Sequence, residues 1–400
     1  MPADMERHDS AWRVFLAFLR LGLTSFGGPI AHLGYFRAEF VERRRWLDDR
    51  SYSDLVALCQ FLPGPASSQV GMALGLGRAG WPGMLAAWVG FTLPSALILM
   101  LFAYGMNEYQ VLADSGWVHG LKVVAVAVVA QAVWGMARAL CPDRFRAGLA
   151  ILAALITLAL PSAVGQVAAI ALAGMLGRIA LQSSPPDVLQ AASYPISRKL
   201  GFAALLLFLL PLAILPIWAA AGGSPTIALL EGFYRSGALV FGGGHVVLPL
   251  LQATVVPTGS VGNAEFLAGY GAAQAVPGPL FTFAAYLGTI ARGPLQGWPG
   301  GLVMLLTLFL PAMLVLVAAL PFWERLRQRP DVQTTMAGVN AGVVGILLSA
   351  LYDPVWTSAV HSRADFGLAL AAFGLLVHGR MPPVLVVGLA ALGGWALAAD

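Results

Sequence analysis

Long apolar segments separated by short polar loops make up almost the whole chain. Several segments approach ~20 residues, the length that an α-helix needs to cross the hydrocarbon core of a bilayer. Full crossings are predicted over residues 82–106, 117–140, 146–160, 162–181, 201–221, 297–320, 333–351, 366–378 and 382–398. The pattern therefore predicts an all-α polytopic membrane protein.

Glycine and proline interrupt the apolar pattern at four places, which form two matching pairs. Residues 60–65 read Gln-Phe-Leu-Pro-Gly-Pro, and residues 274–279 read Gln-Ala-Val-Pro-Gly-Pro. An earlier break precedes each of them, Phe-Gly-Gly-Pro at 26–29 and Phe-Gly-Gly-Gly-His at 241–245. Because these residues stop helices, matching breaks indicate an internal repeat. In membrane transporters, such paired breaks point to the transport site.

The basic residues predict how each half is oriented. The loop that follows the first break carries five arginines, whereas the equivalent loop of the second half, residues 253–264, has no Lys or Arg. Cytoplasmic loops are rich in Lys and Arg, so the first loop and the N-terminus are expected in the cytoplasm and the second loop outside. Segments 12–36 and 52–78 would then enter and leave on the same side as re-entrant helical hairpins.

The same logic predicts two inverted-topology repeats. The N-terminal repeat covers residues 1–181, with two hairpins followed by four crossings, and the C-terminal repeat covers residues 226–400. Its hairpins are expected at 227–251 and 265–292. Residues 182–225 would hold a cytoplasmic linker and one extra crossing helix, which supplies the odd count that inversion requires. This is the plan of many secondary transporters.

Composition supports the membrane class and excludes several others. Of 400 residues, 58% are hydrophobic and only 10% are charged, against ~25% charged in soluble domains. The net charge of +4 comes from short loops beside apolar segments, so it does not indicate nucleic-acid binding. Two cysteines form no metal or disulfide framework. No nucleotide-binding or hydrolase motif occurs in a credible context, so neither a cofactor nor an enzyme activity is expected.

The breaks also predict a site for a small anion. The second arm of each hairpin begins at its break, so the free N–H groups and positive dipole end of that helix should face the protein centre. Four such N-termini would bind an oxyanion with few charged side chains. Arg20 and Arg235 precede the glycine breaks by seven residues, ~10 Å of helix, and an arginine fork suits a tetrahedral oxyanion.

The candidate site residues combine glycine N–H groups, hydroxyls, amides, arginines and a histidine. The predicted substrate-binding residues are Arg20, Thr24, Ser25, Gly27, Gly28, Gln60, Gly64, Ser67, Ser68, Arg235, Gly242, Gly243, His245, Gln274, Gly278 and Thr282. The helix-breaking prolines are Pro29, Pro63, Pro65, Pro277 and Pro279. Asp54 and Glu231 are candidates for proton coupling.

Each of these assignments has a structural alternative. The hydroxyls would also satisfy the broken backbone, and His245 would stabilise its turn. Asp54 would also serve as the cap of the helix that starts near residue 52. Glu231 stands four residues before Arg235 and would neutralise it on one helix face.

Several motifs, in order, resemble those of the chromate ion transporter family. In the first half they are the break at 26–29 with Phe36-Arg37, the run Trp46-Leu47-Asp48 and the stretch 60–65; in the second half they are residues 241–245, 248–251 and 274–279. The resemblance covers roughly residues 15–320. It implies the long two-repeat form in the bacterial inner membrane, exporting chromate at the expense of the membrane potential or proton gradient. It also implies that short relatives assemble from two halves in opposite orientation.

The residues alone predict a transporter for a small anion within the lipid bilayer, and only the resemblance supplies chromate. Sulfate has the same tetrahedral shape and charge. A passive anion channel of the same architecture and a lipid or headgroup carrier are the alternatives. A homodimer through glycine-spaced helix faces stays open.

Overall fold

The computed structural model describes residues 9–25, 28–108, 116–182, 196–222, 224–241, 244–323 and 329–397. These ranges contain helices and no strands, which confirms the all-α class. Five helical segments within them are long and apolar enough to cross a membrane. They are built on α4 (Ala66–Glu108), α6 (Gly116–Leu140), α9 (Arg198–Ala220), α14 (Trp298–Ala319) and α16 (Pro330–Ala350).

The first half starts with short helices that lead into the long helix α4. They are α1 (Ala11–Thr24), α2 (Gly28–Phe36), the π-helical segment η1 (Arg37–Arg43) and α3 (Asp49–Phe61). Side chains cap two of these starts: Ser10 accepts from the N–H of Arg13, and Asp48 accepts from the N–H of Ser51. The breaks fall at glycines in the left-handed region, with φ of +80° at Gly28 and +116° at Gly64.

The second half repeats this order of elements. It contains α10 (Pro225–Leu239), η2 (Gly244–Val246), α11 (Val247–Val255), α12 (Asn263–Ala275), η3 (Leu280–Thr282), α13 (Phe283–Ile290), α14 and η4 (Leu320–Phe322). Gly278 has φ of +104° and mirrors Gly64. Gly80 kinks α4 with φ +63° and ψ −153°, and Gly297 precedes α14 with φ +77° and ψ −155°. The two halves therefore share backbone conformation at equivalent positions.

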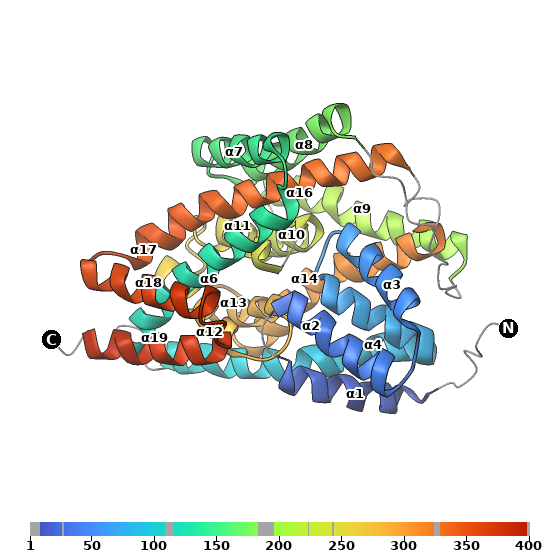
Figure 1. Cartoon of the computed structure of the whole chain (residues 1–400), viewed down its shortest axis with the longest axis horizontal. Helices are drawn as coiled ribbons and strands as arrows, with labels where there is room; N and C mark the ends of the chain where they lie inside the picture. The colour runs from blue at the N-terminus through green and yellow to red at the C-terminus, as the bar shows by residue number, and fades with distance from the viewer. Residues whose placement is uncertain are drawn as a thin grey trace.

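The helices that close each half pack on the other half. These are α7 (Arg144–Ala159) and α8 (Ala163–Ala180) in the first half, and η5 (Leu351–Trp356), α17 (Thr357–Ala359), α18 (Arg363–Val377) and α19 (Pro383–Leu397) in the second. Figure 1 shows the green pair α7–α8 along α16, and the red pair α18–α19 beside α6. Glycines permit this approach, since Gly338 of α16 meets the backbone of Ala173, and Gly120 of α6 meets the backbone of Ala390.

Backbone hydrogen bonds at the breaks join the two halves reciprocally. The N–H of Gly64 donates to the carbonyl of Val240 at 2.7 Å, and the N–H of Gly278 donates to the carbonyl of Ser25 at 2.9 Å. Val240 and Ser25 are the residues directly before the two Phe-Gly-Gly breaks. Each Pro-Gly-Pro turn is therefore completed by the glycine break of the opposite half.

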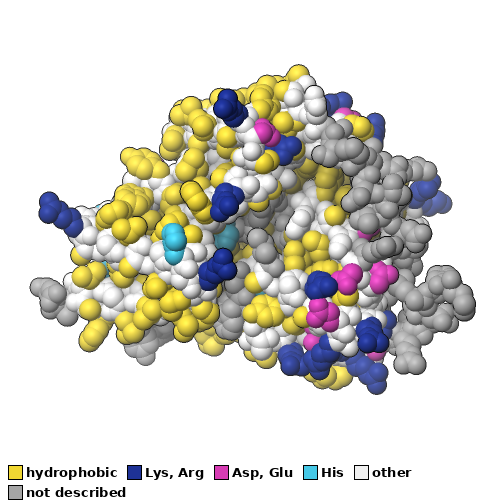
Figure 2. Space-filling view, viewed as in Figure 1, with side chains coloured by type: hydrophobic (Ala, Val, Ile, Leu, Met, Phe, Trp, Pro, Cys, Tyr) yellow, Lys and Arg dark blue, Asp and Glu magenta, His cyan; other side chains and the backbone are white. Residues whose placement is uncertain are grey.

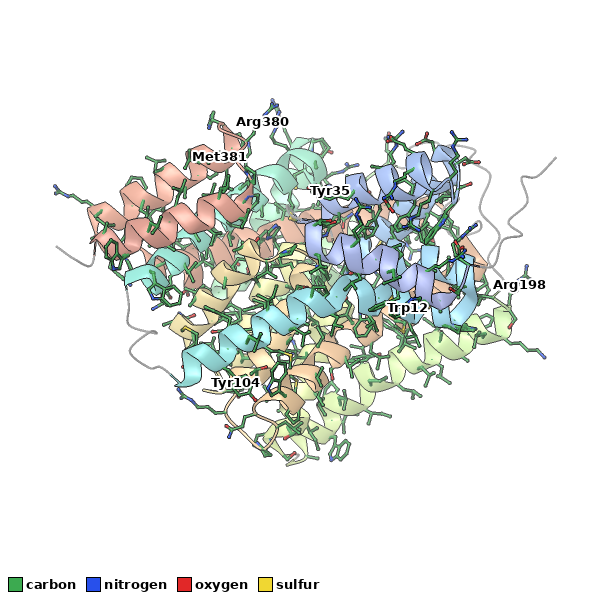
Figure 3. The ribbon with its side chains drawn as sticks, turned by 90° about the horizontal axis from the view of Figure 1, so that it is seen from below. Trp12, Tyr35, Tyr104, Arg198, Arg380 and Met381 are labelled. Carbon is green, nitrogen blue, oxygen red and sulfur yellow. The ribbon has the colours of Figure 1, made fainter. Side chains whose placement is uncertain are left out.

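Charged side chains are most concentrated in one region of the surface seen in Figure 2. Figure 2 shows Lys, Arg, Asp and Glu side chains gathered over the region of α1, α2 and α3, whereas hydrophobic side chains cover much of the opposite end. Helix α9 is the least buried of the five long segments. It lies along the edge of the molecule, with Arg198 at its start (Figure 3). An apolar helix exposed in this way matches a lipid environment.

We predict that Gly64→Ala and Gly278→Ala each destabilise the fold. A Cβ at Gly64 would lie 2.7 Å from the Cβ of Ala312, and one at Gly278 would lie 2.8 Å from Oγ of Ser95. The left-handed backbone adds a cost of about 1 kcal/mol or more. Thermal unfolding in detergent should show a clearly lower midpoint for both variants.

Gly148→Ala is the control, because a Cβ at that position would have no atom within 4 Å other than those of its chain neighbours and its own helix backbone. Equal midpoints for all three variants and the unchanged protein would contradict the role given to the two turns.

Candidate functional site

The four breaks lie against one another in the interior. A Cβ built on Gly244, in the third break, would be 3.2 Å from Cγ of Pro29 in the first and 3.9 Å from Cβ of Leu280 after the fourth. Together with the reciprocal hydrogen bonds, these contacts link all four breaks. Gly27, Gly242 and Gly243 lie outside the described residues.

The predicted hydroxyls separate into two groups. Thr24 donates to the carbonyl of Arg20 at 2.8 Å, and Thr282 donates to the carbonyl of Pro279 at 2.8 Å, so both hydroxyls are bound to backbone carbonyls. Ser25 and Ser68 are buried, yet neither Oγ has a hydrogen-bond partner among the described residues. Ser67 is also buried, 3.4 Å from Nδ1 of His32.

The two arginines occupy equivalent positions but unequal environments. Arg20 is exposed. Arg235 is half-buried and pairs with Glu231 through Nε at 2.6 Å and Nη2 at 3.2 Å. Its Nη1 atom has no partner within the described parts of the chain. The Glu231 ion pair that the spacing allows is therefore formed, and it has no counterpart at Leu16, the equivalent position of the first half.

The amides and the remaining titratable groups are also distributed unequally. Gln60 is exposed, whereas Gln274 is half-buried and its Nε2 lacks a partner among the described residues. Nδ1 of His245 lies 2.7 Å from the hydroxyl of Tyr270. Asp54 is buried inside α3 and accepts from Nε1 of Trp323 at 3.4 Å. The alternative that Asp54 caps its helix is wrong, because Asp48 is the N-cap of α3.

Four buried polar residues near the breaks escaped the sequence prediction. They are His32, Gln69, Thr92 and Ser95, all at most 3% exposed. The amide of Gln69 donates to the carbonyls of Pro63 and Ala312, at 2.8 and 3.2 Å, and so ties the second break to α14. A usable signal existed: an ionisable or hydrogen-bonding side chain in an apolar membrane segment is costly and is often functional.

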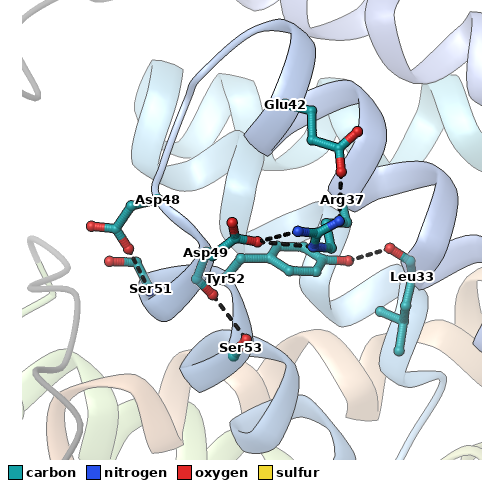
Figure 4. A network of polar contacts seen from close by, with 8 residues as sticks. All are labelled: Leu33, Arg37, Glu42, Asp48, Asp49, Ser51, Tyr52 and Ser53. Atoms are coloured by element: carbon teal, nitrogen blue, oxygen red, sulfur yellow. Dashed lines mark hydrogen bonds and ion pairs between the residues drawn. The ribbon is translucent and has the colours of Figure 1, made fainter.

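The arginine-rich loop forms a separate polar network at the surface. Figure 4 shows Arg37 between Asp49 and Glu42, and the hydroxyl of Tyr52 donating to the carbonyl of Leu33. Close by, Glu39 accepts from both Arg43 and Arg44. Burial raises the pKa of the Glu39 carboxyl, but the hydrogen bonds from Arg44 and Arg43 outweigh it and hold the pKa below its usual range.

Broken helices in two matching halves define this chain as a polytopic α-helical membrane protein with a polar centre. The sequence profile of the chromate transporter family matches residues 12–178 and 227–395, so the chain belongs to that family. Members of this family are transporters rather than enzymes. Among the described residues, no group of three or more His, Cys, Asp or Glu side chains is placed to hold a metal ion.

Three relatives are similar over nearly the full length. The chromate transport protein of Pseudomonas aeruginosa is 26% identical over 96% of this chain and 91% of its own. A probable chromate transport protein of Synechococcus elongatus is 26% identical over 94% and 93%. The chromate transport protein of Cupriavidus metallidurans is 26% identical over 95% and 92%. No solved structure is a significant match for the chain.

We predict that Glu231→Gln destabilises the protein by about 1–3 kcal/mol, because it leaves the Arg235 charge half-buried without a counterion. The double variant Glu231→Gln/Arg235→Gln should lose less stability than the single variant, since it removes both charges. Arg178→Gln is the control, because the Arg178–Asp331 pair is exposed and such pairs contribute ~0–1 kcal/mol. Equal losses in the single and double variants, measured by thermal unfolding, would contradict this account.

The stabilisation from Glu39 should depend on pH. Because its folded-state pKa is lowered, its contribution is fully present above the unfolded-state pKa of ~4.3 and is lost as pH falls through the lowered value. Glu39→Gln should therefore unfold more easily than the unchanged protein at pH 6, with the gap closing below pH ~4. A gap that stays constant over this range would refute the assignment.

Proposed function

We propose that this protein is a secondary active transporter that exports chromate, or a similar tetrahedral dianion such as sulfate, across the bacterial inner membrane and thereby gives chromate resistance. The single observation that carries the proposal is the meeting of four broken helices around buried polar atoms without partners. Free N–H groups at helix starts and hydroxyl or amide donors are what an oxyanion needs. The names of the full-length relatives favour chromate.

The proposed architecture is an inverted repeat with the N-terminus in the cytoplasm. Residues 1–181 and 226–400 form the repeats, the broken segments are re-entrant hairpins, and α9 supplies the extra crossing. Two observations support it. The contacts at the breaks occur between equivalent positions of the two halves, and the loop charges differ between the halves. Unequal loop charge is the usual signal of opposite orientation.

Alternating access would move the anion past these breaks. The helix pair α7–α8 packs on α16, and the pair α18–α19 packs on α6, so the last helices of each half are attached to a long helix of the other half. Such packing would let one bundle rotate against the other as a rigid body. Protons would enter through Asp54 or Glu231. Asp54 accepts a hydrogen bond from Trp323, and Glu231 pairs with Arg235. Protonation of either carboxylate would weaken the contact with its partner.

We predict that inverted membrane vesicles containing the protein accumulate chromate in a manner that excess sulfate inhibits and an uncoupler abolishes. Gln274→Ala should lower the uptake, because its amide is a buried donor without a partner. Vesicles without the protein provide the background. Uptake that persists after the gradient is collapsed would favour a passive anion channel, and uptake equal to the background would overturn the chromate assignment.

A further inference from the structure

The reciprocal contacts create two equivalent junctions in the centre of the protein. The first junction brings together the first break, the fourth break and α4: Gly278 binds the Ser25 carbonyl and packs against Ser95. The second junction brings together the third break, the second break and α14: Gly64 binds the Val240 carbonyl and packs against Ala312. By backbone alone, either junction is an equal candidate for the anion site.

The side chains of the two junctions differ at every compared position. The matches Phe26 with Phe241 and Pro94 with Pro311 set the alignment. The first junction contains Ser25, His32, Thr92 and Ser95, which are 0%, 1%, 2% and 1% exposed. The corresponding residues of the second junction are Val240, Val247, Phe309 and Ala312. These four polar side chains are therefore replaced by apolar ones in the second junction, whereas Gln60 keeps the amide of Gln274, and the second break carries the buried Ser68 and Gln69.

The first junction also holds buried polar atoms that the protein does not satisfy. Oγ of Ser25, Nε2 of His32, Oγ1 of Thr92 and Nε2 of Gln274 have no hydrogen-bond partner among the described residues. Native proteins rarely leave such atoms unpaired, because an unsatisfied buried polar group destabilises the fold. Gln60, the equivalent of Gln274, is exposed. The unpaired atoms come from four separate segments, the end of α1, α2, α4 and α12, so no single helix accounts for them.

His32 is held by two neighbours that leave its Nε2 atom without a partner among the described residues. Its Nδ1 lies 3.4 Å from Oγ of Ser67, and its ring meets the ring of Phe91 edge-on at 5.1 Å between centroids. The Ser67 hydroxyl can either donate to Nδ1 or accept from it. When it donates, the proton of the neutral ring lies on Nε2, which is the tautomer that an anion at Nε2 requires. His32 also lies in the first turns of α2, whose leading N–H groups have no partners within the helix.

We propose that the first junction is the single oxyanion site of this protein and that His32 is a substrate-binding residue, donating from Nε2 to the anion beside Ser25, Thr92 and Gln274. The second junction is its structural copy and binds no anion. This inference rests on the proposed transport of a tetrahedral dianion. It assigns the anion site to one of the two equivalent junctions. Chromate and sulfate only accept hydrogen bonds, which fits a site whose unpaired side chains can all donate.

The test compares His32→Leu, His32→Gln and Thr92→Val with Thr289→Val in the purified, detergent-solubilised full chain. Thr289 is 3% exposed, but its hydroxyl already donates to the carbonyl of Ala285 at 2.7 Å, so it controls for removing a buried hydroxyl. The readouts are the Kd for radiolabelled sulfate and the KM for chromate uptake in vesicles. Size-exclusion profiles show which variants are folded.

We expect His32→Leu and Thr92→Val to raise the sulfate Kd and the chromate KM roughly tenfold each, the effect of losing about one hydrogen bond. His32→Gln keeps a hydrogen-bond donor, so its Kd and KM should rise less than those of His32→Leu. Thr289→Val should have the same Kd and KM as the unchanged protein. If His32→Leu does not fold, His32→Gln and Thr92→Val decide the matter. Folded His32 and Thr92 variants with unchanged Kd and KM, in a protein that does bind sulfate, would overturn the one-sided site alone. No sulfate binding and no chromate uptake by the unchanged protein would instead overturn the proposed function.

Discussion

Two backbone hydrogen bonds, from Gly64 to Val240 and from Gly278 to Ser25, are the constraint on which the rest of this structure depends. A helix that stops inside an apolar bundle leaves N–H and carbonyl groups with no water to bind, and each unsatisfied group costs several kcal/mol in such surroundings. Here each half supplies the acceptor that the other half's turn requires. Neither half can close its own breaks, so the two must fold as one unit.

The same requirement explains the residues found at these positions. The N–H of the turn can reach across only because its glycine adopts a left-handed conformation and has no Cβ to strike Ala312 or Ser95. Small residues follow Pro94 and Pro311 for this reason. The last helices of each half also pack on the other half, which makes the two halves depend on each other further. Gly120 and Gly338 bring α6 and α16 into backbone contact with those helices.

Much of this arrangement was predictable from sequence, because local chemistry decides it. Glycine and proline mark the breaks, the matched motifs mark the repeat, and apolar length marks the long helices. The packing of α7–α8 on the second half and of α18–α19 on the first half was not predictable, since hydropathy carries no information about which helices become neighbours. Arg20 and Arg235 differ in their ion pairing, because Arg235 pairs with Glu231 and the residue equivalent to Glu231 in the first half is Leu16. His32 was missed because its burial arises only when α2 docks against Ser67 and Phe91 of α4.

A two-fold backbone with one-sided chemistry has a physical rationale. A transport site needs unpaired donors, and unpaired donors destabilise the protein whenever the anion is absent, by about 1–3 kcal/mol each. A symmetric protein would carry that cost twice for a single substrate. At the second junction, Val240, Val247, Phe309 and Ala312 replace four polar side chains. This lowers the cost and adds apolar packing, although Ser68 and Oε1 of Gln69 at the second break also lack partners among the described residues. The repeat then supplies the geometry of the breaks, and the divergence of its side chains decides where an anion binds.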